Sequence, residues 1–99
     1  MVLEIVTWKS KPSVTDQEMI DAVNKMVPDL KKLEGFIRQT LYKDKDGNWT
    51  DIYYWDTTEN AHLSNERMAD KASLKNLLSF ILLESVSIKI LEPLQDSNH

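Results

Sequence analysis

The sequence contains no cysteine and only two glycines and three prolines in 99 residues. Without cysteine the chain can form no disulfide and offers no thiolate as nucleophile or metal ligand. Gly35 and Gly47 lie too far apart to form a glycine-rich phosphate loop, which excludes the nucleotide-binding fingerprints built on such loops. A cysteine-free chain fits a cytoplasmic protein, and we expect that location.

Long apolar runs and concentrated positive charge are also missing. The longest apolar stretch, residues 77–83, is interrupted by Ser79 and falls well short of the roughly 18 residues of a membrane span. The first residues, Met1 to Glu4, lack the basic segment of a signal peptide. The net charge of −4 argues against nucleic acid, because binding phosphates requires a concentrated cationic surface. We therefore expect no membrane and no nucleic-acid partner.

The amino-acid composition is that of an ordinary globular domain. Hydrophobic residues make up 41% of the chain and charged residues 28%. This length predicts a single domain, residues 1–92, followed by a polar tail, residues 93–99, that begins at Pro93. A core this small gains stability from dimerisation.

Two helical regions follow from capping and periodicity. Thr15 and Glu18 form a capping-box pattern, and apolar residues recur at helical spacing from Met19 to Leu33 before Gly35. Pro28 predicts a kink or a break inside this helix. A second helix is expected from Thr57 or Thr58 to about residue 70, and apolar spacing over residues 74–82 predicts a third helix or a continuation.

Four segments read as strands: residues 2–9, 36–43, 48–56 and 86–90. Asp46-Gly47 predicts a hairpin between the second and third. The order β-α-β-β-α-(α)-β is that of the α+β, ferredoxin-like split βαβ fold, with a four-stranded antiparallel sheet and its helices on one face. Apolar residues occur on both faces of these strands, so we expect a second chain to cover the free face.

This order, the Gly35-Phe36 opening and the run from Tyr53 to Thr58 resemble the dimeric α+β barrel superfamily, in particular its antibiotic-biosynthesis-monooxygenase-like branch. The resemblance implies a homodimer with an eight-stranded barrel and a ligand pocket between sheet and helices. Some members are cofactor-independent oxygenases of aromatic polyketides, and others degrade haem. Trp55 matches the Trp of the haem-degrading members. The first strand has no matching Asn, and His62 comes too early for the haem ligand, so haem is not expected.

The hairpin register determines which side chains share a face. A two-residue turn at Asp46-Gly47 would place Tyr42 opposite Asp51 and Arg38 opposite Trp55. A mixed face would then line the barrel interior: Phe36, Arg38, Thr40, Tyr42, Asp51, Tyr53 and Trp55. The other, more aliphatic face would pack on the helices: Ile37, Gln39, Leu41, Ile52 and Tyr54. A four-residue loop keeps this arrangement, whereas a five-residue loop reverses it.

Two interpretations of the mixed face stay open. In one, Trp55, Tyr53 and Tyr42 form the wall of a pocket for a flat apolar ligand, with Asp51 and Arg38 orienting its polar groups. Trp8 on the first strand is a further candidate lining residue. In the other, the same side chains make the dimer interface, where aromatics and Arg are enriched.

His62 is the histidine within the predicted domain and a candidate general base, with Arg38 as a candidate to polarise a carbonyl. Glu59, His62 and Glu66 share a helical spacing typical of a solvated face, so no metal is expected. The function predicted is that of a cofactor-independent monooxygenase acting on aromatic or polyketide-like substrates. The alternative is a non-catalytic dimeric module for ligand binding or interaction.

Overall fold

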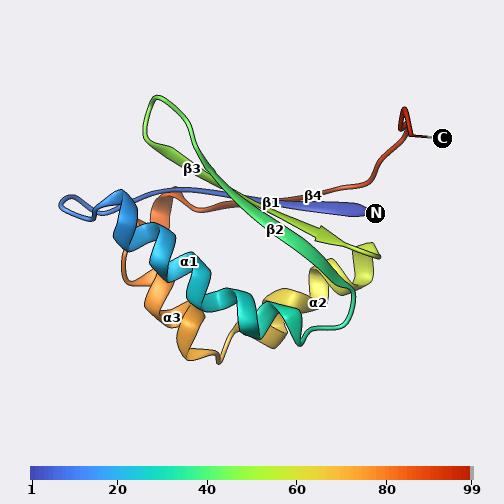
Figure 1. Ribbon diagram of the computed structural model, residues 1–99, viewed down its shortest axis with the longest axis horizontal. Helices are drawn as coiled ribbons and strands as arrows, with labels where there is room; N and C mark the ends of the chain where they lie inside the picture. The colour runs from blue at the N-terminus through green and yellow to red at the C-terminus, as the bar shows by residue number, and fades with distance from the viewer. Residues whose placement is uncertain (99) are drawn as a thin grey trace.

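The computed structural model describes residues 1–98 as one layer of strands packed against one layer of helices (Figure 1). The elements follow in the order β1 (Val2–Lys9), α1 (Asp16–Lys31), β2 (Phe36–Lys43), β3 (Asn48–Trp55), α2 (Thr58–Met68), α3 (Ala72–Leu78), a short 3₁₀ turn η1 (Leu83–Ser85) and β4 (Ser87–Leu91). The sheet order is β2-β3-β1-β4 with every pair antiparallel. The predicted ferredoxin-like α+β fold is confirmed, with α3 as a separate third helix.

The start of α1 follows the predicted capping box. The Glu18 amide donates to Thr15 Oγ1 at 3.1 Å, and the Thr15 amide donates to Glu18 Oε1 at 2.9 Å. The expected break at Pro28 is wrong, because α1 continues to Lys31. Pro28 lies in the last turn, where the core contacts of Met26 and Leu30 hold the helix on the sheet.

The hairpin between β2 and β3 has a longer loop than a two-residue turn. Lys43 pairs with Trp49, which leaves residues 44–48 as the five-residue connection. The Asp44 carboxylate organises it, since its Oδ1 accepts hydrogen bonds from the amides of Asp46 and Asn48, both at 2.9 Å. The two-residue turn is therefore wrong, and the five-residue register is the one observed.

This register changes the faces of the sheet. Asp51, Tyr53 and Trp55 do not share a face with Arg38, Thr40 and Tyr42, because Leu41 is opposite Asp51 and Arg38 is opposite Tyr54. Buried residues alternate along β3, and they join a core cluster with residues of α1, α2 and α3. The mixed aromatic side of β3 thus packs beneath the helices, contrary to the prediction. Large indole and phenol rings fill the space between the two layers better than the shorter aliphatic side chains do.

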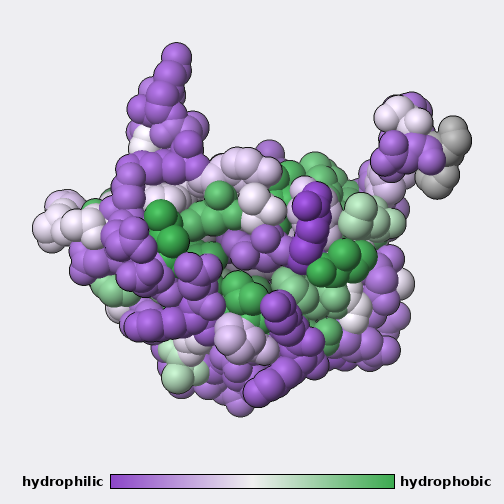
Figure 2. Space-filling view, viewed as in Figure 1, coloured by the Kyte–Doolittle hydropathy of each residue, from purple (hydrophilic) through white to green (hydrophobic). Residues whose placement is uncertain are grey.

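The opposite side of the sheet, called here the open face, carries no helix. It comprises the outward-facing residues of the two central strands and of β2: Leu3, Ile5, Thr7, Thr50, Ile52, Tyr54, Arg38, Thr40 and Tyr42. Arg38 lies over the Tyr54 ring, with its guanidinium carbon 4.2 Å from the ring centre. In Figure 2, hydrophobic surface runs through the middle of the molecule, whereas the projecting hairpin tip and C-terminal tail are hydrophilic.

Candidate functional site

A cavity of about 260 Å³ lies between the sheet and the helices. Three aromatic residues, Trp8, Tyr53 and Trp55, and three polar residues, Glu4, Ser64 and Asn65, contribute to its lining. The remaining lining side chains are apolar and come from α1, α2, α3, β1, β4 and the segments beside α3 and η1. Its volume is at the small end of ligand pockets, which typically span about 300–1,000 Å³. The cavity suits a small, largely apolar molecule.

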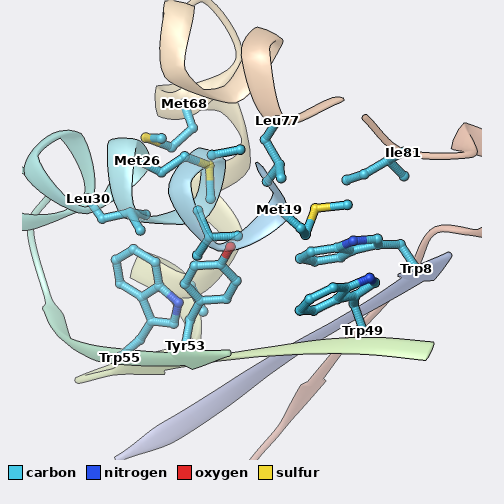
Figure 3. Packing of buried hydrophobic residues seen from close by; sticks show 13 residues of the cluster. Trp8, Met19, Met26, Leu30, Trp49, Tyr53, Trp55, Met68, Leu77 and Ile81 are labelled. Atoms are coloured by element: carbon cyan, nitrogen blue, oxygen red, sulfur yellow. The ribbon is translucent and has the colours of Figure 1, made fainter. Parts of the chain in front are cut away.

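The aromatic wall of the cavity comes from the two central strands. Tyr53 and Trp55 project from β3 toward Met26 and Leu30 of α1 (Figure 3). The Trp55 ring is fully buried and packs edge-on against Phe36, with ring centres 5.5 Å apart. Alternation along β3 places Tyr53 and Trp55 on one face, two residues apart. These contacts hold the rings as a rigid surface for a flat ligand.

Glu4 brings a carboxylate into this apolar cavity. Its side chain is only 3% exposed, and its Oε1 accepts a hydrogen bond from the Trp55 indole at 3.1 Å. Its Oε2 is buried and has no hydrogen-bond partner within the described residues. Burial raises the pKa of Glu4, while the polar side chains of Trp55, Asn65 and Ser64 oppose that rise. A buried acceptor without a donor costs free energy that a bound ligand can recover.

Glu4 was not predicted as a site residue from the sequence. Its signal was a lone acidic residue in the apolar strand at residues 2–9, on the same face as Val6 and Trp8. In the structure, Glu4 is directly opposite Tyr53 of β3 and next to Ile90 of β4 on the other side. A charged residue at the centre of a buried sheet face is a candidate for chemistry.

A second buried acid lies behind Tyr53. Asp51 is fully buried, and its carboxylate accepts hydrogen bonds from the Tyr53 hydroxyl at 2.5 Å and from Gln39 Nε2 at 2.5 Å. Burial is the main cause that raises the pKa of Asp51 to about 6, and the nearby charge of Glu4 adds to it. Burial and the Asp51 charge also raise the pKa of Tyr53 well above its usual value. With Asp51 ionised, the Tyr53 hydroxyl donates to it, and its oxygen can accept a hydrogen bond from the cavity.

Two indole N–H groups are buried without acceptors. Trp8 and Trp49 are paired across β1 and β3, and their rings lie one above the other (Figure 3). Neither Nε1 has a hydrogen-bond partner within the described residues, and Trp8 lines the cavity. The Trp8 N–H is therefore a buried donor without an acceptor, on a residue of the cavity wall.

The structure brings only part of the predicted site residues together. Trp55, Tyr53 and Trp8 line the cavity, and Asp51 contacts it through Tyr53. Tyr42 lies on the open face with 52% of its surface exposed, because the five-residue loop turns it away from Asp51.

The two predicted catalytic residues lie outside the cavity. Arg38 is exposed on the open face, above Tyr54. His62 is exposed on α2 and borders a shallow depression beside β4, which shares Asn65 and Ile88 with the cavity. Neither residue is among those that line the cavity, although the charge of His62 lowers the pKa of Glu4. Their catalytic roles stay predictions.

Within residues 1–98, no group of three or more acidic or histidine side chains is placed to hold a metal ion. In the same residues, no helix is long and apolar enough to cross a membrane.

Comparison with known proteins identifies the fold. No protein-family model matches the sequence, and no curated protein matches it either. Solved structures do match. SnoaB, a cofactor-independent oxygenase from Streptomyces nogalater, superposes with a TM-score of 0.76 at 13% identity over 99% of this chain and 97% of its own.

Two further structures extend the comparison. A candidate antibiotic biosynthesis monooxygenase from Bordetella bronchiseptica gives a TM-score of 0.80 at 15% identity, over 95% of this chain and 97% of its own. NE2512 from Nitrosomonas europaea, a protein of unknown function, gives a TM-score of 0.74 at 12% identity, over 97% of this chain and 91% of its own. The chain therefore has the fold of the antibiotic-biosynthesis-monooxygenase-like proteins, as its sequence pattern indicated.

Proposed function

We propose that this protein is a small-molecule oxygenase that acts without metal or flavin on an aromatic or polyketide-like substrate held in the cavity. The observation that carries the proposal is the cavity itself, with its aromatic wall of Trp8, Tyr53 and Trp55 and the unpaired carboxylate of Glu4. The fold shared with SnoaB, which is a cofactor-independent oxygenase, supports the same chemistry.

The chemistry proposed begins with removal of a proton. A hydroxyaromatic or an activated CH₂ group beside Glu4 would give its proton to the carboxylate, and the electron pair would stay on the ring as an enolate or phenolate. That electron-rich anion can reduce molecular oxygen and combine with it. Conversion of a CH₂ group to a carbonyl consumes one O₂ and releases one water. In this proposal the Trp8 N–H, which lacks an acceptor, would bind a ring carbonyl.

The proposal includes a homodimer that pairs the two open faces. Half-buried residues of the central strands, such as Ile5 and Ile52, lie there side by side without a covering helix. Apolar patches of this kind normally mark interfaces. Residues 1–92 would form the domain and residues 93–99 a tail, in a protein whose lack of cysteine supports a cytoplasmic location.

Oxygen uptake with anthrone or dithranol as substrate tests the function. We expect substrate-dependent O₂ consumption and formation of the corresponding quinone. Glu4→Gln should lower the rate by about 100-fold or more, in the range of a lost general base. Glu66→Gln on the exposed side of α2 is the matched control and should leave the rate unchanged.

Two other substitutions test the earlier catalytic candidates. His62→Ala and Arg38→Ala should have little effect, because both side chains lie outside the cavity. Ligand binding without any O₂ uptake would contradict the oxygenase and favour a non-catalytic binding module.

A further inference from the structure

The unpaired oxygen of Glu4 points to the kind of ligand that the cavity selects. We infer that Glu4 Oε2 is the acceptor for an O–H or N–H group of the ligand, so that the cavity selects flat aromatic molecules carrying a hydroxyl or amino group. This inference rests on the cavity of the proposed function, and it concerns binding alone.

Internal partners do not satisfy this oxygen. The Trp55 indole donates to Oε1, the other oxygen of the carboxylate, at 3.1 Å. The nearby Ser64 hydroxyl donates to the Ala61 carbonyl at 2.6 Å and is thereby occupied. Asn65 and Ser64 lie close enough to the carboxylate to lower the pKa of Glu4, but neither meets Oε2 with the geometry of a hydrogen bond. Oε2 is left without a donor among the described residues.

The surroundings keep Glu4 in place while leaving Oε2 available. The hydrogen bond from Trp55 fixes the orientation of the carboxylate, and the indole itself is held by Phe36. Glu4 lies on a central strand paired on both sides, so it cannot turn outward to water without disrupting the sheet. A preorganised, desolvated acceptor gives strong discrimination, because a ligand lacking the donor leaves it unpaired.

The charges around Glu4 favour a donor over an acceptor. Asp51 lies behind Tyr53 on the neighbouring strand, and the charge of Glu4 helps to raise the pKa of Asp51, so two acidic groups adjoin this part of the cavity. His62 on the exposed side of α2 is the group whose charge lowers the pKa of Glu4, and it is the smallest of the contributions to that pKa. Tyr53 keeps its proton, because burial and Asp51 raise its pKa well above the usual value. A ligand hydroxyl or ammonium group is thus attracted, whereas a carboxylate is repelled.

Binding of three matched naphthalenes tests the inference by isothermal titration calorimetry under nitrogen. The probes are 2-naphthol, which donates a hydrogen bond, 2-methoxynaphthalene, which only accepts one, and 1-naphthylmethylamine, which is a cation. We expect 2-naphthol to bind about 10- to 100-fold more tightly than its methyl ether, the ratio given by a hydrogen bond to a charged group. Comparison of the amine with 2-naphthol decides between ammonium and hydroxyl ligands.

Glu4→Gln provides the decisive variant. Its side chain can still accept from Trp55 through Oε1 and would present an NH₂ group in place of Oε2. The preference for 2-naphthol over the ether should fall to about 1 or invert, while Glu66→Gln should keep the wild-type ratio. An unchanged ratio in Glu4→Gln, with its fold intact by circular dichroism, would overturn the inference.

The pH dependence of binding to the wild-type protein tests the same inference even if the Glu4→Gln variant does not fold. Lowering the pH protonates Glu4, and a neutral carboxyl is a weaker acceptor, so the naphthol-to-ether ratio should fall as the solution is acidified. A ratio independent of pH would contradict the role of Glu4. Selective binding without oxygen uptake would keep this inference and overturn only the proposed oxygenase.

Discussion

The Tyr53 hydroxyl donates a hydrogen bond of 2.5 Å to the buried carboxylate of Asp51, two residues back along β3. Tyr53 lines the cavity, and the Asp51 carboxylate behind it is fully buried. Gln39 on β2 supplies the second donor to Asp51, so the acid is held from two strands. A buried carboxylate of this kind makes the stability of the protein depend on pH.

The first prediction concerns that pH dependence. The folded-state pKa of Asp51, about 6, lies above its usual value of 3.8, so the folded state binds the proton more tightly than the unfolded state. The stabilisation is complete below about pH 4 and is lost as the pH rises through about 6. This shift corresponds to about 3 kcal/mol in the free energy of unfolding. Glu4 contributes in the same direction, since its pKa is also raised.

Urea unfolding of the wild type and of Asp51→Asn between about pH 4.5 and about pH 8 measures the effect. The Asn side chain keeps an acceptor for Tyr53, and Gln39 can flip its amide to accept from the new NH₂ group. We expect the variant to lose less stability than the wild type over this range. Equal slopes in the two proteins would show that Asp51 does not titrate there.

The second prediction removes the donor to Asp51. Tyr53→Phe leaves the buried carboxylate with Gln39 alone and should cost about 1–3 kcal/mol at about pH 8. The cost should shrink near pH 5, where Asp51 is protonated. Tyr54→Phe is the matched control, because Tyr54 lies on the open face, and it should change the free energy of unfolding by less than about 0.5 kcal/mol. Equal costs at the two pH values would argue against the ionised pair.

The third prediction compares the two glycines. Both have left-handed backbone angles, with φ of +83° at Gly35 and +85° at Gly47. A Cβ at Gly35 would lie 2.2 Å from Asp56 Oδ1 and 2.6 Å from Asn60 Nδ2, whereas a Cβ at Gly47 would meet nothing within 4 Å.

Gly47→Ala should therefore cost about 1–2 kcal/mol from the backbone alone. Gly35→Ala should cost clearly more, because it also disrupts the hydrogen bond of 2.9 Å between Asn60 and Asp56. Chemical denaturation of both variants measures the difference. Equal losses in the free energy of unfolding for the two variants would show that the close packing around Gly35 does not contribute to stability.

The fourth prediction tests the proposed homodimer. Ile52 is opposite Ile5 at the centre of the open face, so Ile52→Asp would place a charge in the middle of the interface. Sedimentation should give a dimer for the wild type and a monomer for this variant. Leu94→Asp, at a fully exposed position in the tail, should stay dimeric. A wild-type monomer at micromolar concentration would contradict the proposed assembly.

The helices and strands of this protein and their order follow from local patterns along the chain. The Thr15–Glu18 capping box, the apolar stripe of α1 and the alternation along β3 are local patterns, set by side chains within a few residues of one another. They were enough to predict the ferredoxin-like fold and to place Tyr53 and Trp55 on the same face.

The face of the sheet that the helices cover depends on contacts between residues far apart in the chain. The Asp44 carboxylate accepts hydrogen bonds from two backbone amides of the five-residue loop. The resulting one-residue change of register turns Arg38, Thr40 and Tyr42 to the open face, whereas a register shift after Phe36 keeps that residue opposite Trp55. Arg38 and Tyr42 therefore lie on the open face and not in the predicted site. The unpaired oxygen of Glu4 likewise depends on long-range packing, because this residue of β1 is buried among side chains of β3 and α2 that no local pattern brings together.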